Sequence, residues 1–406
     1  MVSALENGVK GGKWYSLMDK VCAPATLAAA WERVRSNGGA AGVDGESIER
    51  FAARSGGYLA ELERALRQGS YRAQAVRRVD IPKGDGRTRP LGIPTVKDRL
   101  VQTAVKLVIE PIFEATFMPA SYGFRPGRSA KDALREVDRL TKDGLTWVVD
   151  ADLEGYFDSI PHDRLMERVE ERISDGRVLD LIRGWLEQDV LHGMERWQPT
   201  GGTPQGAVIS PLLANIYLHP LDEHMAMLGH RMVRYADDFV VLCKTREEAE
   251  AALAQIRAWV AQNGLRLHKD KTRLGNCRQP GEGFEFLGYR FEAGRRWVRK
   301  RSMDRLKDRV RELTRRTRGD SLARIIADLN PVLRGWFGYF KHAHHTTFRA
   351  VDGFVRRRLR AILLRQRKRS RVGNLPVDHQ RWPNTFFAEA GLLALATARQ
   401  MARRPR

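Results

Sequence analysis

The hydrophobic and polar positions of the chain follow two spacings, and each spacing predicts a different kind of element. Apolar residues that recur every three or four positions predict one face of an α-helix. The predicted helices span residues 26–37, 59–68, 96–113, 164–191, 210–217, 247–260, 304–318, 322–329, 330–340 and 354–364. Short runs of β-branched and aromatic residues predict strands. The predicted strands span 76–89, with a turn at 83–86, then 147–152 and 284–291.

Two further strand signals end in carboxylates. Residues 231–244, RMVRYADDFVVLCK, predict a β-hairpin with Asp237 and Asp238 at its tip. Residues 146–160, TWVVDADLEGYFDSI, end their apolar run at Asp152. Neighbouring carboxylates repel one another, and burying them is costly unless a cation neutralises them. We therefore expect the three aspartates to form one cluster that holds two Mg²⁺ ions for in-line attack at phosphorus.

The same stretches resemble the reverse transcriptase family. The Tyr-Ala-Asp-Asp hairpin matches the signature of that family, and Asp152 followed by Phe157 matches its first palm motif. GGTPQGAVISPLLANIYL, at 201–218, matches the motif between them, and LNPVLRGW, at 329–336, resembles domain X of group II intron reverse transcriptase/maturases. The resemblance covers roughly residues 26–400. It implies an α+β right-hand polymerase with fingers, a palm that contains an antiparallel sheet, and a helical thumb/domain X.

The resemblance also implies how the chain is divided. The expected segments are a leader (1–25), an N-terminal extension with fingers (26–145), a palm with inserted helices (146–290), a thumb/maturase domain X (291–369) and a basic C-terminal extension (370–406). No cysteine follows Cys277, so the Cys- and His-dependent HNH endonuclease found in many intron proteins is not expected.

The family's site residues carry over onto matching positions. Asp152, Asp237 and Asp238 are the expected catalytic residues, and they bind the metal together with Leu153; Mn²⁺ is a possible substitute for Mg²⁺. The expected nucleotide-binding residues are Lys83, Arg89, Phe157, Gln205, Gly206 and Lys271.

Each nucleotide-binding residue has an implied role. The cations at 83 and 89 would hold the triphosphate. Phe157 would block the 2′-hydroxyl and so favour deoxynucleotides, while the pair at 205–206 would lie beneath the nascent base pair. Lys271, with Lys269 as its rival, would lie near the leaving pyrophosphate.

The distribution of charge predicts a polyanionic partner. The chain has 71 Lys and Arg against 49 Asp and Glu, a formal charge of +22. Residues 291–406 contain 30 of the basic and 9 of the acidic residues, a net charge of +21, so residues 1–290 carry only +1. Such a concentration is typical of a nucleic-acid-binding surface. The candidate contacts are Arg125, Arg128, Arg356, Arg357, Arg358 and Arg360.

The remaining sequence features limit the location of the protein. Cys22, Cys243 and Cys277 have neither metal-ligand nor disulfide spacing, which indicates a reducing compartment such as the bacterial cytoplasm or nucleoid. No apolar run reaches the roughly 18–20 residues that a membrane span requires, so no membrane partner is expected.

The favoured function is an RNA-directed DNA polymerase, a nucleotidyltransferase that also binds its group II intron RNA to assist splicing and mobility. Its expected partners are structured RNA, an RNA template with a DNA primer, dNTPs and a DNA target. Two alternatives stay open: a domesticated or defence-associated reverse transcriptase without an intron, and an RNA-binding maturase with little polymerase activity. The second is disfavoured because the residues expected for polymerase activity are all present, namely Asp152, Asp237, Asp238, Phe157 and Gln205. Intron RNA domains flanking the reading frame would separate the first from the favoured function.

Overall fold

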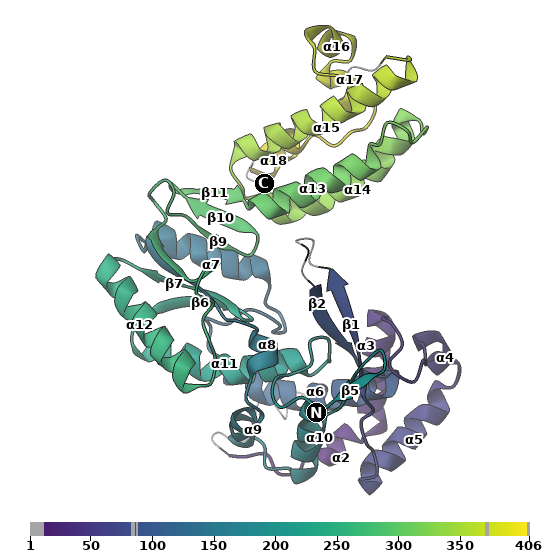
Figure 1. Ribbon diagram of the computed structural model, residues 1–406, viewed down its shortest axis with the longest axis vertical. Helices are drawn as coiled ribbons and strands as arrows, with labels where there is room; N and C mark the ends of the chain where they lie inside the picture. The colour runs from purple at the N-terminus through teal and green to yellow at the C-terminus, as the bar shows by residue number, and fades with distance from the viewer. Residues whose placement is uncertain (1–11, 83–85, 87, 370–372, 404–406) are drawn as a thin grey trace. The chain divides into compact units, whose positions relative to one another are not determined.

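The computed structural model describes residues 12–82, 86, 88–369 and 373–403 (Figure 1). The chain forms two compact units, one of Met1–Leu145 with Val149–Arg273 and one of Thr146–Val148 with Leu274–Arg406. The division at 273 precedes the predicted end of the palm at 290, and the five expected segments stay predictions. Among the described helices, none is both long enough and apolar enough to span a membrane.

The described N-terminal part of the first unit contains five helices, of which α2 (Met18–Val21) and α3 (Pro24–Asn37) pack on the long apolar helix α6 (Val96–Glu114). That helix, α6, buries a broad face, and it begins at Thr95, whose side-chain oxygen accepts a hydrogen bond from the Asp98 backbone N–H. α3 packs against it through Leu27 and Trp31. These helices are α2 (Met18–Val21), α3 (Pro24–Asn37), α4 (Ile48–Ala53), α5 (Ser55–Gln68) and α6 (Val96–Glu114).

A small sheet of order β2-β1-β4-β5 follows the helices. Its strands are β1 (Val76–Pro82), β2 (Thr88–Ile93), β4 (Val190–His192) and β5 (Glu195–Trp197). β1 and β2 confirm the two predicted strands, and the turn predicted at 83–86 lies outside the described residues except for Gly86. The sequence did not predict the β4–β5 hairpin. Each of its strands is only three residues long, and β4 pairs in parallel with β1, more than a hundred residues earlier. A local pattern cannot show such a pairing.

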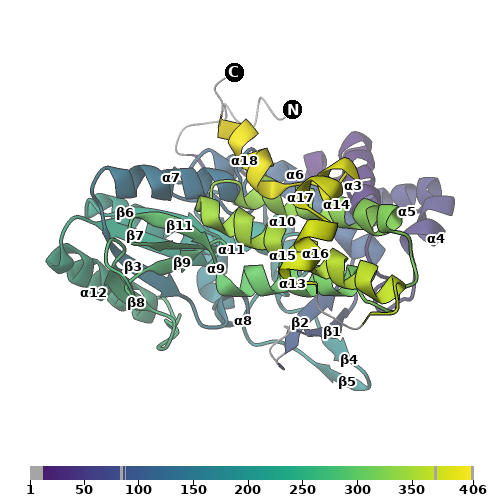
Figure 2. The ribbon, with the colours of Figure 1, turned by 90° about the horizontal axis from the view of Figure 1, so that it is seen from above.

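A second four-stranded sheet has the order β6-β7-β3-β8. Its strands are β3 (Trp147–Asp152), β6 (Arg231–Tyr235), β7 (Asp238–Cys243) and β8 (Arg273–Asn276). In Figure 2 the sheet lies between α7 (Ala130–Lys142) and α12 (Arg246–Gln262), and Phe239–Cys243 of β7 are buried. The remaining helices of the first unit are α7 (Ala130–Lys142), α8 (Tyr156–Ser159), α9 (His162–Glu170), α10 (Gly176–Leu186), α11 (Ser210–Met227) and α12 (Arg246–Gln262).

The second unit combines a three-stranded antiparallel sheet with helices. The strands are β9 (Phe284–Phe286), β10 (Tyr289–Glu292) and β11 (Arg295–Val298), in the order β11-β10-β9. The strand predicted at 284–291 is therefore divided into two strands, and the turn between them falls in the Phe-Leu-Gly-Tyr stretch at 286–289, which resembles the primer-gripping turn of the family. Leu287 and Gly288 both have positive φ, 48° and 83°, and form a two-residue turn between β9 and β10.

The helices of the second unit are α13 (Lys300–Leu313), α14 (Leu322–Phe340), α15 (His345–Gln366), α16 (Pro376–Arg381), α17 (Asn384–Glu389) and α18 (Leu395–Arg403). α14 corrects the prediction of two helices that meet at Pro331, because the helix continues through this proline. α15 buries an apolar stripe at helical spacing, which consists of Phe348, Val351, Val355, Leu359 and Ile362.

Two polar side chains fasten the C-terminal segment to these helices. Asn330 of α14 donates to the Gly391 carbonyl at 2.9 Å and accepts from the Leu393 N–H at 2.9 Å. Asp352 of α15 accepts from the N–H groups of Leu395 and Ala396, at the start of α18, at 2.9 and 3.0 Å. The described part of the tail is therefore an integral part of the second unit.

Candidate active site

The predicted hairpin is present, and its two-residue turn is strained. Tyr235 pairs with Asp238 across β6 and β7, which leaves Ala236 and Asp237 as the central residues of the turn. Ala236 has φ of 61°, a region that residues with a side chain rarely adopt. A residue held in this way costs on the order of 1–3 kcal/mol, and such strain persists only where the surroundings impose it.

The end of β3 delivers Asp152 next to a lysine. Oδ2 of Asp152 lies 2.7 Å from Nζ of Lys271, which donates a hydrogen bond to it. The backbone places the two residues together, because the His268 N–H donates to the Asp152 carbonyl at 2.8 Å and Leu153 pairs with Leu267. The lysine that the family resemblance puts near the leaving pyrophosphate is thus an immediate neighbour of the first aspartate.

Asp152 lies close enough to Asp237 for its negative charge to act on the pKa of Asp237. Burial raises the pKa of Asp237, and the negative charge of Asp152 raises it further, while Arg89 and Arg234 oppose the shift. A pair of carboxylates with this unfavourable potential fits a hard divalent cation. Over the described ranges, no three acidic, histidine or cysteine side chains converge closely enough to form a complete metal site.

A hydrogen-bonded chain connects the second finger strand to the loop before α11. Nε of Arg89 donates to Oε1 of Gln205 at 2.7 Å, and Nε2 of Gln205 donates to Oδ2 of Asp158 at 3.3 Å. The Gly92 N–H also donates to the Gln205 carbonyl at 2.6 Å. The structure therefore brings Arg89 and Gln205 together, and the charge of Arg89 also lowers the pKa of Asp237. Lys83, the other predicted phosphate contact, lies outside the described residues.

Gly206 shows why this loop needs a glycine. Its φ is 113°, and a Cβ on it would lie 2.4 Å from the Gly92 carbonyl oxygen. Gly206→Ala should push the loop away from β2, destabilise the protein by about 1–3 kcal/mol and lower kcat/KM for dNTP incorporation. Gly57→Ala, in open space on α5, is the control and should leave both quantities near the wild-type values. Steady-state incorporation and thermal unfolding measure the two effects, and wild-type kinetics for Gly206→Ala would contradict the tight loop contact.

Phe157 is fastened through its backbone and enclosed by rings. Its carbonyl accepts from the Thr203 N–H at 2.6 Å. Its ring centroid lies 5.6 Å from that of Tyr156 and 6.4 Å from that of Phe124, both in edge-on orientation. Only 8% of Phe157 is exposed, so its position is well determined by packing.

A cavity of about 370 Å³ borders Gln205, and sequence reasoning missed part of its wall. Trp197 of the β4–β5 hairpin lines it, with the guanidinium of Arg78 at 5.7 Å from the ring centroid. An aromatic ring with a cation over it suits stacking against a nucleobase. In the sequence, the available signal was Trp197, which follows Gly193-Met194. Trp197 indicates a wall of this cavity only once β4 is known to pair with β1.

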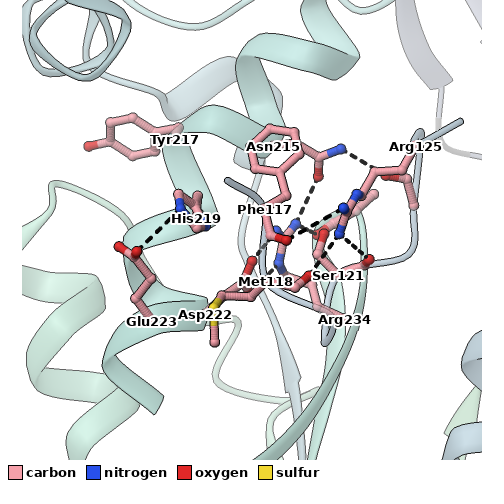
Figure 3. Close-up of polar contacts among 12 residues, drawn as sticks. Phe117, Met118, Ser121, Arg125, Asn215, Tyr217, His219, Asp222, Glu223 and Arg234 are labelled. Atoms are coloured by element: carbon pink, nitrogen blue, oxygen red, sulfur yellow. Dashed lines mark hydrogen bonds and ion pairs between the residues drawn. The ribbon is translucent and has the colours of Figure 1, made fainter. Parts of the chain in front are cut away.

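The two arginines predicted in the loop before α7 do not behave alike. Arg125 is only 7% exposed, and it forms an ion pair with Glu114 and donates to the carbonyls of Met118 and Ser121 (Figure 3). Its predicted contact with nucleic acid is wrong, because the guanidinium is used inside the fold. Arg128 is half-buried and donates to the Pro119 carbonyl at 2.7 Å; its nucleic-acid contact stays a prediction.

The four arginines predicted on α15 also divide into two kinds. Arg360 is 2% exposed and donates to the Trp382 carbonyl at 3.0 Å, so its predicted contact with nucleic acid is wrong. Arg358 donates to the hydroxyl and the carbonyl of Thr314 at 2.9 and 2.7 Å, which assigns it to packing against the end of α13. Arg357 is exposed and Arg356 is half-buried, and both remain candidates for RNA contact.

Known protein families match both units. The reverse transcriptase (RNA-dependent DNA polymerase) family matches residues 81–291, more than half of the chain. The chain belongs to this family and is an RNA-directed DNA polymerase, and the expected right-hand polymerase fold is confirmed. The maturase-specific domain of group II introns matches residues 303–376, which confirms the resemblance to intron reverse transcriptase/maturases.

Two curated proteins and one solved structure are similar to this chain. Protein YkfC of Escherichia coli (strain K12) is 37% identical over 330 residues, which cover 70% of this chain and 84% of YkfC. Group II intron-encoded protein LtrA of Lactococcus lactis subsp. cremoris is 30% identical over 341 residues, 67% of this chain and 56% of LtrA. The match thus spans little more than half of LtrA. A solved partial Cas6-RT-Cas1--Cas2 complex aligns with 61% of this chain and 41% of its own, at 27% identity and a TM-score of 0.39.

Proposed function

We propose that the first unit copies RNA into DNA with two Mg²⁺ ions at Asp152 and Asp237, and that the second unit binds a group II intron RNA. The observation that carries the polymerase site is the arrangement of these two aspartates with Arg89, Gln205 and Lys271. The maturase-specific domain in the second unit supports the role in splicing.

Asp152 and Asp237 would hold the metal ions, with Asp238 in a lesser or structural part and the Leu153 carbonyl as a further ligand. The ions would supply a lowered pKa for the attacking 3′-hydroxyl and charge stabilisation on the phosphoryl oxygens. The raised pKa of Asp237, to which burial and the charge of Asp152 contribute, is the feature that fits this cation. Mn²⁺ would be a substitute with the same oxygen ligands.

The chain's own residues would orient the nucleotide and neutralise its charge. Arg89, exposed on β2, would leave Gln205 to form bidentate hydrogen bonds with the triphosphate. Lys271 would exchange its carboxylate partner for the pyrophosphate as metal binds Asp152. Phe157 would close the space next to C2′ of the sugar, because its ring is already fixed by two neighbouring rings.

RNA binding by the second unit rests on accessible cations rather than on the total charge. Arg356 and Arg357 lie on α15, within the part that matches the maturase domain. If each meets one phosphate, Arg356→Ala with Arg357→Ala should flatten the slope of log K against log salt by about 1.4, at about 0.7 per single-stranded phosphate. Filter binding at several salt concentrations measures the slope.

The matched control for that experiment is Arg33→Ala with Arg64→Ala, two exposed arginines of the first unit. The plot of log K against log salt for this control should run parallel to the plot for the wild type. Parallel lines for the Arg356/Arg357 variant would contradict RNA contact by this face of α15.

Selective binding separates the intron maturase from a reverse transcriptase without an intron. A group II intron RNA should bind more tightly than an unrelated structured RNA of equal length, and the protein should accelerate splicing of the former. Equal affinity and no effect on splicing, with RNA-templated synthesis intact, would favour the domesticated or defence-associated alternative. We place the protein in the cytoplasm or nucleoid, which agrees with its three buried, unpaired cysteines, Cys22, Cys243 and Cys277.

A further inference from the structure

A buried ion pair lies next to the turn that carries Asp237 (Figure 3). Nε of Arg234 donates to Oδ1 of Asp222 at 2.7 Å, and Nη2 donates to the other carboxylate oxygen. Both side chains are 0% exposed. A buried ion pair of this kind adds little net stability compared with apolar residues of the same volume. Its hydrogen bonds to other groups therefore need an explanation.

The third nitrogen of the guanidinium connects this ion pair to the turn. Nη1 of Arg234 donates to the Ala236 carbonyl at 2.9 Å and to Oδ1 of Asn215 at 2.9 Å. Nδ2 of Asn215 in turn donates to the Gly123 carbonyl at 2.8 Å. One planar guanidinium thus joins α11, the strained turn and, through Asn215, the loop before α7. Only arginine has the fixed fork of donors for such a connection.

The loop before α7 restrains the same turn through its backbone. The Tyr122 N–H donates to the Arg234 carbonyl at 2.9 Å, and the Arg234 N–H donates to the Ala120 carbonyl at 2.9 Å. A Cβ on Gly123 would lie only 2.3 Å from the Ala236 nitrogen. The backbone of this loop therefore lies directly against the residue whose φ is 61°.

We propose that Arg234, Asp222, Asn215 and Gly123 act together as a clamp that positions the Asp237 carboxylate for metal binding. The clamp would hold Ala236 in its strained conformation, so that the next residue faces Asp152 at a constant distance. These four are positioning residues, since they act through the turn and do not touch the nucleotide. The proposal rests on the metal-dependent polymerase function proposed above.

The test uses three ways of loosening the clamp in the full chain. Asp222→Leu with Arg234→Met removes the ion pair as a unit and so avoids an unpaired buried charge. Asn215→Ala removes the connection to Gly123, and Gly123→Ala pushes the Ala236 backbone away. The last two variants lose no charged group, so they keep the test decisive if the double variant fails to fold.

Two controls change similar features away from the turn. Arg360→Met removes a buried arginine of the second unit, and Gly57→Ala adds a methyl group in open space on α5. For every variant, we would measure the half-saturating Mg²⁺ concentration for primer extension, kcat at saturating Mg²⁺, the Kd for primer–template without metal, and the thermal unfolding midpoint.

Loosening the clamp should raise the half-saturating Mg²⁺ concentration by about 10- to 100-fold, the range found for groups that orient metal ligands. It should also lower kcat, while the primer–template Kd stays within about twofold of wild type and the controls keep the wild-type Mg²⁺ dependence. An unchanged Mg²⁺ dependence in folded Asn215→Ala and Gly123→Ala would overturn the clamp, as would a loss of activity explained by primer–template affinity alone. A wild-type protein that extends primers without Mg²⁺ or Mn²⁺ would contradict the proposed function itself.

Discussion

Asp237→Asn should lower primer extension by on the order of 10³-fold or more, because the metal-held charge at the reacting phosphate would be lost. Asp152→Asn should have an effect of the same size, whereas RNA affinity should stay near the wild-type value, since the basic surface is untouched. Single-turnover extension with saturating template measures the loss. Extension at a rate close to wild type by either variant would remove that aspartate from the metal site.

The raised pKa of Asp237 allows a second experimental test of the same site. Ionised Asp237 costs folding free energy above its folded-state pKa, and this cost disappears as the pH falls through that pKa. Asp237→Asn should therefore be at least as stable as wild type near pH 7, which excludes unfolding as the cause of its inactivity. Because Mg²⁺ competes with the proton, more Mg²⁺ should move the acidic limb of the pH–rate profile of wild type to lower pH. A limb that does not respond to Mg²⁺ would contradict metal binding at Asp237.

Phe157→Ala should reduce the preference for dNTP over NTP by about 10- to 100-fold, the discrimination expected when one side chain excludes a single hydroxyl. The structure supports a rigid barrier, since Phe124 and Tyr156 fix the ring and the Thr203 N–H fixes its backbone. The measurement is the ratio of kcat/KM for each dNTP to that for the matching NTP.

Two controls make the result on Phe157 specific. Phe157→Tyr keeps the bulk of the ring and should retain the preference for dNTP. Phe124→Ala removes the supporting ring, which is 47% exposed, and should lower the preference less than removal of Phe157 itself. An unchanged ratio in Phe157→Ala would leave sugar selection to another residue.

The central site could be predicted because its signals are local. One apolar run ends at Asp152, and two apolar runs flank Asp237. These local patterns place a carboxylate at the end of a strand independently of the rest of the chain. The repulsion between carboxylates led us to expect one cluster, and the family resemblance supported that expectation. The ion pair with Lys271 and the strain at Ala236 follow from the backbone path, which no residue pattern specifies.

The errors arose where distant segments decide the environment. Arg357 and Arg360 are three positions apart in one basic run, but Trp382 and Phe387 from the tail cover only Arg360. Pro331 predicted a helix start because proline usually stands there. In the structure, α14 runs on through the proline, and the Asn330 side chain forms hydrogen bonds with the Gly391 carbonyl and the Leu393 N–H.

The attachment of the tail sets the order in which the protein can mature during synthesis. Asn330 and Asp352 bond to residues that lie 43 to 63 positions further along the chain. Until the ribosome has passed Ala396, a growing chain exposes the apolar and polar groups of α14 and α15 that the tail later covers. Domains usually fold in the order of synthesis, so the polymerase unit can form first while the unit with the maturase domain waits. Chains that stop before residue 390 would keep those surfaces open and become targets for chaperones and proteases.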